Sequence, residues 1–131
     1  MFELHGPWVD MGSPKAGSAA TPLLTGGGVP TANAQITLTL TDAPPSTVAY
    51  LLYGIQQLNL PYLSGNIVPD FAGPGGGLVI LPTDGLGQLT VGGPMPLDTP
   101  VGLPLYFQYW LDDPAASFAV AASNAVGAQT R

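Results

Sequence analysis

The sequence predicts an all-β protein, an antiparallel β-sandwich of Ig-like or jelly-roll-like form with about eight or nine short strands. Short apolar runs are separated by clusters of Gly, Pro, Asn and Asp at intervals of about ten residues, the spacing of strands joined by turns. Residues 35–41 alternate without a break. Hydrophobic residues make up 46% of the chain, so burial can offset the entropy cost of ordering its 18 glycines and 15 prolines.

The first half of the chain predicts four strands. Residues 8–11 and 21–25 are short apolar runs, and a glycine turn closes the second. In the run 35–41, the isoleucine and leucines share one face, which we expect in the core, and the threonines share the solvent face. Residues 47–56 are apolar almost throughout, which predicts a strand buried on both faces, or at least a central one.

The middle of the chain is less regular. Residues 58–67 show no sustained period, and we expect an irregular crossing there. Residues 78–81 and 88–91 predict two strands, with a turn at 82–85 between them. Three prolines between residues 94 and 100 predict a loop.

The last third begins with an aromatic strand at 103–111. Period two places Tyr106, Gln108 and Trp110 on one of its faces and the remaining aromatic side chains on the other. Those remaining side chains are Phe107 and Tyr109.

A turn follows the aromatic strand, and residues 114–116 are compatible with a single helical turn. Residues 118–122 and 125–130 then predict a closing hairpin that reverses at Ser123 and Asn124.

Several segments together resemble a recurrent module of secreted planctomycete and myxobacterial proteins, one often found at the C-terminal end of longer chains. The resemblance covers residues 8–131 and runs through WVDMG, PLLTGGG, TLTLT, LPTDGLGQLTV, LPLYFQYWLDDPAA and FAVAASNAV. Its most specific part is residues 105–124. The resemblance implies a β-sandwich and brings no catalytic residues with it.

The charge excludes nucleic acid as a partner, and the placement of prolines and glycines argues against insertion into a membrane. Eight acidic and two basic side chains give a net charge of −6. A nucleic-acid binder needs a basic stripe, whereas Lys15 and Arg131 are the only cations here. Prolines and glycines interrupt the uncharged stretch 43–69, so no membrane-inserted helix is expected. Low Lys, high Gly, Pro, Ala and Thr and a pI near 4.1 favour an extracellular protein at the cell surface or in the medium.

The sequence does not predict an enzyme or a cofactor. His5 is the single imidazole and cysteine is absent, while most acidic residues stand in turns, where Asp acts as a turn former. Asp112 and Asp113 are the one candidate calcium pair, because adjacent carboxylates and loop carbonyls supply hard oxygen ligands. The simpler interpretation is that Asp113 before Pro114 caps a turn, and we expect no metal.

The sparse charge is the main functional signal. Only 8% of the residues are charged, and large uncharged surfaces predict protein–protein contact. We divide the chain into an N-terminal extension, 1–7, and a single sandwich domain, 8–131. Phe2 and Leu4 alternate in the extension, so it can add as an edge strand to its own sheet or as a donor strand to a neighbour. With Trp8 they are the candidate self-association residues.

We therefore expect a non-enzymatic extracellular structural protein that associates with copies of itself, as a filament or surface-layer subunit. The alternative is a glycan-binding or adhesion module. Aromatic side chains stack well on apolar faces of sugars. The candidate stacking residues are Tyr106, Tyr109 and Trp110.

Overall fold

The computed structural model describes residues 7–131. Within them the chain forms eleven β-strands and one 3-10 turn, η1 (Ser117–Ala119). The strands are β1 (Val9–Gly12), β2 (Leu23–Gly27), β3 (Gln35–Thr41), β4 (Val48–Gly54), β5 (Gln57–Tyr62), β6 (Gly65–Pro69), β7 (Gly77–Pro82), β8 (Leu89–Pro94), β9 (Pro104–Asp112), β10 (Val120–Ala122) and β11 (Ala125–Gln129). The predicted all-β class and the antiparallel sandwich are confirmed, with more strands than the eight or nine expected.

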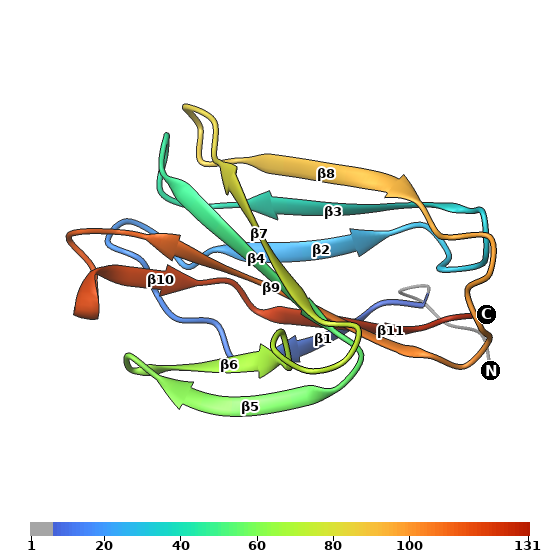
Figure 1. Ribbon diagram of the computed structural model, residues 1–131. Coiled ribbons are helices and arrows are strands. Elements are labelled where there is room, and N and C mark those ends of the chain that lie inside the picture. Colours follow the sequence, from blue (N-terminus) through green and yellow to red (C-terminus); the bar gives the residue numbers. More distant parts are fainter. Residues whose placement is uncertain (1–6) are drawn as a thin grey trace.

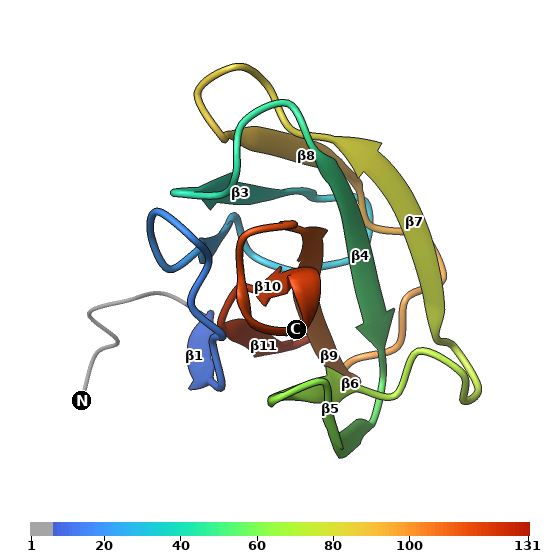
Figure 2. The same ribbon diagram turned by 90° about the vertical axis from the view of Figure 1, so that its left-hand side faces the viewer.

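The strands form three layers (Figure 1). The central sheet has the order β1-β11-β9-β4-β7, and β10 also pairs with β9. The covering sheet, β2-β3-β8, packs on one face of the central sheet, and the β5–β6 hairpin lies against the other (Figures 1 and 2). The result is a β-sandwich with a small third layer.

Two apolar clusters hold these layers together. The inner core lies between the central and covering sheets and the outer core between the central sheet and the hairpin. The buried inner-core residues are Trp8, Leu24, Leu38, Leu40, Ala43, Ala49, Leu51, Tyr109, Leu111, Val126 and Ala128. Those of the outer core are Leu52, Ile67, Trp110 and Ala122.

The face assignments made from period two are confirmed. Leu38 and Leu40 of β3 are buried in the inner core, and Ile36 packs against it. Tyr109 of β9 is in the inner core and Trp110 in the outer core, as their opposite faces require. Strand β4 lies between β9 and β7 and contributes residues to both cores, as its continuous apolar run predicts.

The predicted irregular crossing at 58–67 is wrong, because these residues belong to the β5–β6 hairpin. Two features explain why sequence patterns do not indicate this hairpin. Its reversal uses Leu63 and Ser64 in left-handed conformations (φ 46° and 70°), where Asn-Gly would be the usual signal. Asn59, also left-handed at φ 51°, and Pro61 break the alternation of β5.

The predicted closing hairpin at the C-terminus is also wrong. Strands β10 and β11 both pair with β9 and lie end to end along it, separated by Ser123 and Asn124. The Ser123 hydroxyl replaces a backbone acceptor there, since it accepts the Tyr109 N–H at 3.0 Å.

Residues 113–116 form a single turn, closed by the Ala116 N–H donating to the Asp113 carbonyl at 2.9 Å, and the 3-10 turn η1 follows it directly. Its Phe118 adopts a left-handed backbone conformation, φ 57° and ψ 19°.

Candidate functional site

Exposed sheet edges are the positions where a sandwich can pair with another chain. The edge of β2 is closed by a side chain. The Leu24 N–H donates to Asn124 Oδ1 at 2.8 Å, and Asn124 Nδ2 donates to the Leu24 carbonyl at 3.0 Å. Asn124 thus takes the place of a neighbouring strand and ties the covering sheet to the central sheet.

The edge of β6 is closed in the same way by Gln108 of β9. The Val68 N–H donates to Gln108 Oε1 at 3.0 Å, and Gln108 Nε2 donates to the Asn66 carbonyl at 3.1 Å and the Ser123 carbonyl at 3.2 Å. Gln108 is completely buried. One amide side chain therefore attaches the hairpin to the central sheet.

Three further edges are interrupted by features that discourage strand addition. Strand β1 has four residues, a register shift and the charged Asp10. Strand β5 has a register shift and contains Pro61. Strand β8 pairs with β3 without a register shift, but half of it is Gly92, Gly93 and Pro94, which have low β-propensity, so only residues 89–91 offer a regular edge.

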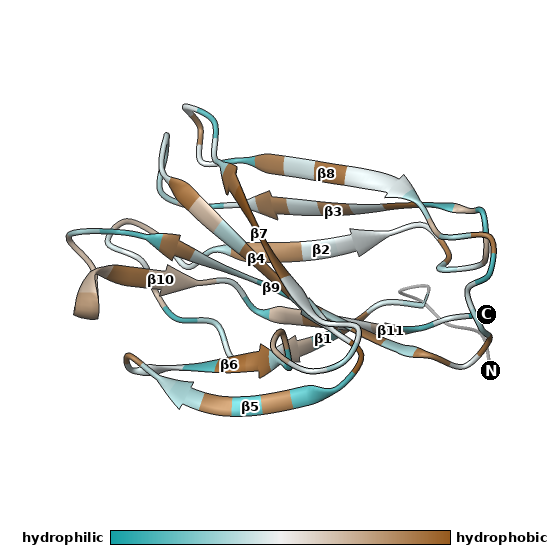
Figure 3. Ribbon diagram, in the orientation of Figure 1, coloured by the Kyte–Doolittle hydropathy of each residue, from teal (hydrophilic) through white to brown (hydrophobic). Residues whose placement is uncertain are grey.

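Strand β7 is the exception. It lies at the margin of the central sheet, pairs with β4 without a register shift, and carries no charge (Figure 2). Its apolar side chains remain exposed, with Leu78 at 45%, Val79 at 39% and Ile80 at 61%. Figure 3 shows the upper part of this strand as one of the most hydrophobic segments of the molecule. The nearest charged residues in sequence are Asp70 and Asp84.

The pairing with β4 identifies which backbone groups of β7 are available. Thr83 follows β7, and its N–H donates to the Thr47 carbonyl at 2.9 Å. Backbone hydrogen bonding alternates along an antiparallel strand, so the backbone N–H and C=O groups of Val79 and Leu81 point toward β4. The residues whose backbone groups point away from β4 are Leu78, Ile80 and Pro82. Within residues 7–131 these outward groups have no strand partner.

A groove of about 480 Å³ lies on the outer face of the central sheet, over β1, β11 and β9. Gly127 forms its floor, because a Cβ at this position would come within 3.2 Å of Tyr106 and 3.3 Å of the Met11 sulfur. Tyr106 and Met11 therefore flank the floor. Tyr106 is the one predicted stacking residue that lines this groove.

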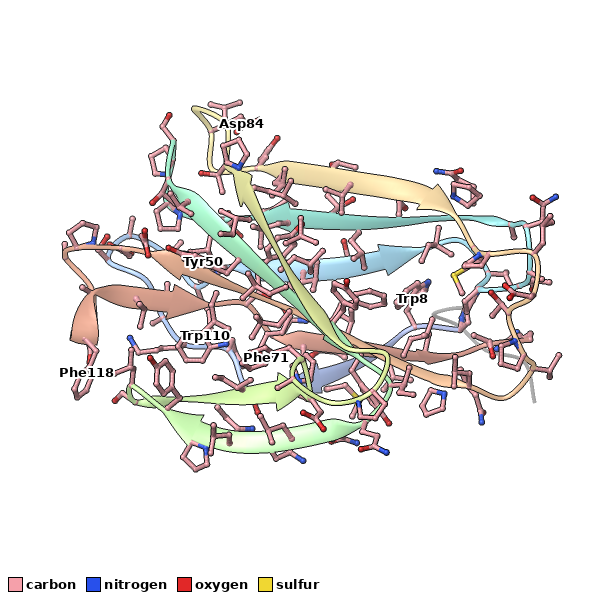
Figure 4. All side chains as sticks on the ribbon, in the orientation of Figure 1. Trp8, Tyr50, Phe71, Asp84, Trp110 and Phe118 are labelled. Carbon is pink, nitrogen blue, oxygen red and sulfur yellow. The ribbon has the colours of Figure 1, made fainter. Side chains whose placement is uncertain are left out.

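The other two stacking candidates lie in the interior. Tyr109 is 0% exposed in the inner core, and burial raises the pKa of its hydroxyl to about 12. Trp110 is 6% exposed and meets Tyr62 of the hairpin edge-on, with ring centroids 5.9 Å apart (Figure 4). A sugar ring cannot reach either side chain, so the three-residue platform is not formed.

Trp8, a candidate self-association residue, is used within its own fold. Its Nε1 donates to the Gly28 carbonyl at 2.8 Å, and its ring covers Gly26, where a Cβ would come within 2.2 Å of it. Trp8 thus joins the central sheet to the covering sheet. Phe2 and Leu4, like the rest of the predicted extension before Pro7, lie outside the described residues.

The calcium candidates have separate hydrogen-bond partners. Asp112 Oδ2 accepts the Tyr50 hydroxyl at 3.3 Å, and Asp113 Oδ2 accepts the Ser18 N–H at 2.7 Å and its hydroxyl at 3.0 Å. Burial by itself raises the pKa of Asp113, but the Ser18 hydrogen bonds and the nearby Lys15 charge outweigh it and lower that pKa. In the described part of the chain, no three metal-ligating acidic or imidazole side chains gather.

Among residues 7–131, no helix has the length and apolar character to cross a bilayer.

No protein-family model, no curated protein and no solved structure matches the chain. Its functional interpretation therefore depends on its own residues. The most distinctive feature of the described surface is the regular, uncharged and unpaired edge of β7. Composition indicated a charge-poor surface, but no sequence signal pointed to this strand as the open edge.

Proposed function

We propose that the chain is a non-enzymatic structural subunit that acts outside the cell and associates with copies of itself through the edge of β7. The observation that carries the proposal is that edge: a regular strand with outward N–H and C=O groups at Leu78 and Ile80 and apolar side chains on both faces. A regular apolar edge strand is a template for pairing with another chain.

The treatment of the other edges supports this choice. Buried amides close the edges of β2 and β6, and bulges, glycines or prolines interrupt those of β1, β5 and β8. Natural sandwiches suppress unwanted pairing by such means. A protein that suppresses pairing elsewhere and leaves β7 regular is consistent with one intended pairing edge.

A filament or a surface layer requires a second contact, because pairing of β7 joins one copy to one other. Phe2 and Leu4 remain our sequence-based candidates for that second contact. The extracellular location likewise remains an inference from composition.

The proposal is tested by comparing Ile80→Pro with Ile80→Ala. The Ile80 N–H points away from β4, so proline removes it without breaking the β4–β7 ladder. In a symmetric pair the substitution removes one hydrogen bond from each copy, about 2 kcal/mol in total, which weakens association about 30-fold. Ile80→Ala shortens the side chain but keeps the donor. We expect sedimentation velocity to show dimers for the wild type, a smaller loss for Ile80→Ala and monomers for Ile80→Pro.

Val101→Ala is the control substitution. The Val101 side chain is 80% exposed, more than Leu78, Val79 or Ile80 of β7, and it lies in a turn far from that strand in the sequence. The substitution should leave association unchanged. A wild-type chain that stays monomeric at about 100 µM, where a contact of micromolar strength is populated, contradicts the proposal.

A second candidate function, glycan binding, is favoured by the groove at Gly127. Tyr106 offers an aromatic face there, and the exposed Gln129 lines the same groove with an amide. Aromatic faces and amide hydrogen bonds together are what a neutral sugar needs.

Tyr106→Ala tests this function. If a glycan binds in the groove, loss of the ring should weaken binding about tenfold in titration calorimetry with a hit from a glycan array. Phe118→Ala is the matched control, since Phe118 is an aromatic residue 64% exposed at the opposite end of β9, outside the groove (Figure 4). Equal effects of the two substitutions count against the groove.

A further inference from the structure

We propose a specific geometry for the association: two copies pair their β7 strands antiparallel about a two-fold axis that passes beside Val79. This inference rests on the proposed function and names the partner as a second copy of the chain. The pairing continues the central sheet of one copy into that of the other. A two-fold contact of this kind is isologous, because each copy presents the same edge.

The register follows from the outward groups. With Val79 opposite the Val79 of the second copy, Leu78 lies opposite its Ile80, and the reverse pair is equivalent. Each of these two pairs exchanges both N–H···O=C hydrogen bonds, which makes about four in total. Every outward donor and acceptor of Leu78 and Ile80 is then satisfied.

The neighbouring registers leave groups unpaired. Centring the axis on Ile80 places Leu78 opposite Pro82, which has no N–H, so the Leu78 carbonyl loses its donor. Centring it on Leu78 places Ile80 opposite Gly76, whose N–H already donates to the Gly73 carbonyl at 3.0 Å. A shift by one residue from any of these places outward groups opposite inward ones and forms no ladder.

The side chains fit the same register. Val79 lies on the inner face opposite Leu51 of β4, whereas Leu78 and Ile80 lie on the outer face opposite Leu52 and Tyr50. The contact therefore sets valine against valine on one face and leucine against isoleucine on the other. Such β-branched and aliphatic cross-strand pairs are favourable.

Net charge and buried area determine how strong the contact between the two copies is expected to be. Each copy carries a net charge of −6, and none of that charge lies on β7, so the copies repel at long range while their edges do not. Salt should therefore strengthen the contact. Six-residue strands bury less than the roughly 800 Å² per partner of a standard interface, so a weak dimer is expected.

Disulfide trapping tests the register, and the chain is suited to it because it contains no cysteine. Residues opposite each other in a non-hydrogen-bonded antiparallel pair have Cα atoms about 4.5 Å apart, within the range that a disulfide spans. Val79→Cys should therefore form a covalent dimer under mild oxidation. The two Ile80 Cα atoms would be about 8 Å apart, from two rises and one strand spacing, beyond disulfide reach.

Two arms complete the experiment. Ile80→Cys should stay monomeric on a non-reducing gel, and a mixture of Leu78→Cys and Ile80→Cys should cross-link although neither does so by itself. Cross-linking of Ile80→Cys as fast as Val79→Cys overturns the register. If the wild type dimerises and no variant cross-links, the β7 geometry is wrong while self-association stands. If the wild type is monomeric and nothing cross-links, the proposed function fails as well.

Discussion

Asn124→Leu is expected to lower the free energy of unfolding by about 4 kcal/mol. Leucine has the branched shape of asparagine and the same number of side-chain heavy atoms, but it is bulkier and cannot pair with the backbone of Leu24, which is 1% exposed. The Leu24 N–H and C=O then stay buried without partners, and each unsatisfied group costs about 1–3 kcal/mol. The covering sheet also loses its hydrogen-bonded link to the central sheet.

Urea unfolding followed by tryptophan fluorescence measures this loss, because Trp8 joins the same two sheets. Asn124→Asp distinguishes the contributions of the two hydrogen bonds between Asn124 and the Leu24 backbone. It keeps an acceptor for the Leu24 N–H but places a carboxylate against the Leu24 carbonyl and 3.2 Å from the Asp10 carboxylate, if the aspartate occupies the asparagine position. A loss below about 1 kcal/mol for Asn124→Leu would show that solvent reaches Leu24 and that the side chain does not replace a strand.

Gln108→Leu is expected to cost about 3 kcal/mol and to loosen the β5–β6 hairpin in particular. Leucine leaves the buried Val68 N–H and the Asn66 carbonyl without their side-chain partner. Because the hairpin otherwise depends on the small outer core, its backbone should open more often than that of the central sheet.

Hydrogen exchange is the informative measurement for Gln108→Leu. The Val68 amide should lose protection by more than that of Tyr109, whose N–H donates to the Ser123 hydroxyl at the β10–β11 junction and not to the hairpin. Gln88→Leu is the matched control, since Gln88 is exposed and its side chain makes no hydrogen bond, so its effect should stay within about 0.5 kcal/mol. Equal loss of protection at the two amides would mean that Gln108 stabilises the whole sheet and not the hairpin.

The two amides explain how a chain with few charges keeps its layers in register. Gln108 extends from one face of β9 to the hairpin, and Asn124 extends from the β10–β11 junction to the covering sheet. Toward the strand edge, each amide directs one N–H donor and its acceptor oxygen, the same pair that a peptide group presents to a neighbouring strand. Both edges are thereby closed, and β7 is left as the regular open edge.

Much of the fold could be predicted locally. The period of β3 and the opposite faces of Tyr109 and Trp110 follow from strand geometry, which depends only on neighbouring residues. The hairpin at Leu63 and Ser64 could not be predicted, because ordinary residues adopt a turn conformation there that sequence patterns associate with glycine or asparagine.

The candidate site was less accessible from the sequence. The sequence predicts a strand at 78–81 and, from its sparse charge, surfaces that contact other proteins, but no pattern in it indicates that this strand is such a surface. Their aromatic rings make Tyr109 and Trp110 candidates for sugar stacking, but both side chains are buried in the core. Large amphipathic side chains fit a sugar site and a core equally well, so burial is what separates the two.

The sequence by itself determined the all-β class, the alternation of faces in regular strands such as β3 and β9, and the shortage of charge. These are properties of residues and their near neighbours. Only the tertiary structure decided the order of strands in the central sheet, and with it that β7 is at the margin while β4 and β9 are inside. Strand order arises from contacts between residues far apart in the chain, because it depends on which strand combination buries the most apolar surface and satisfies the backbone.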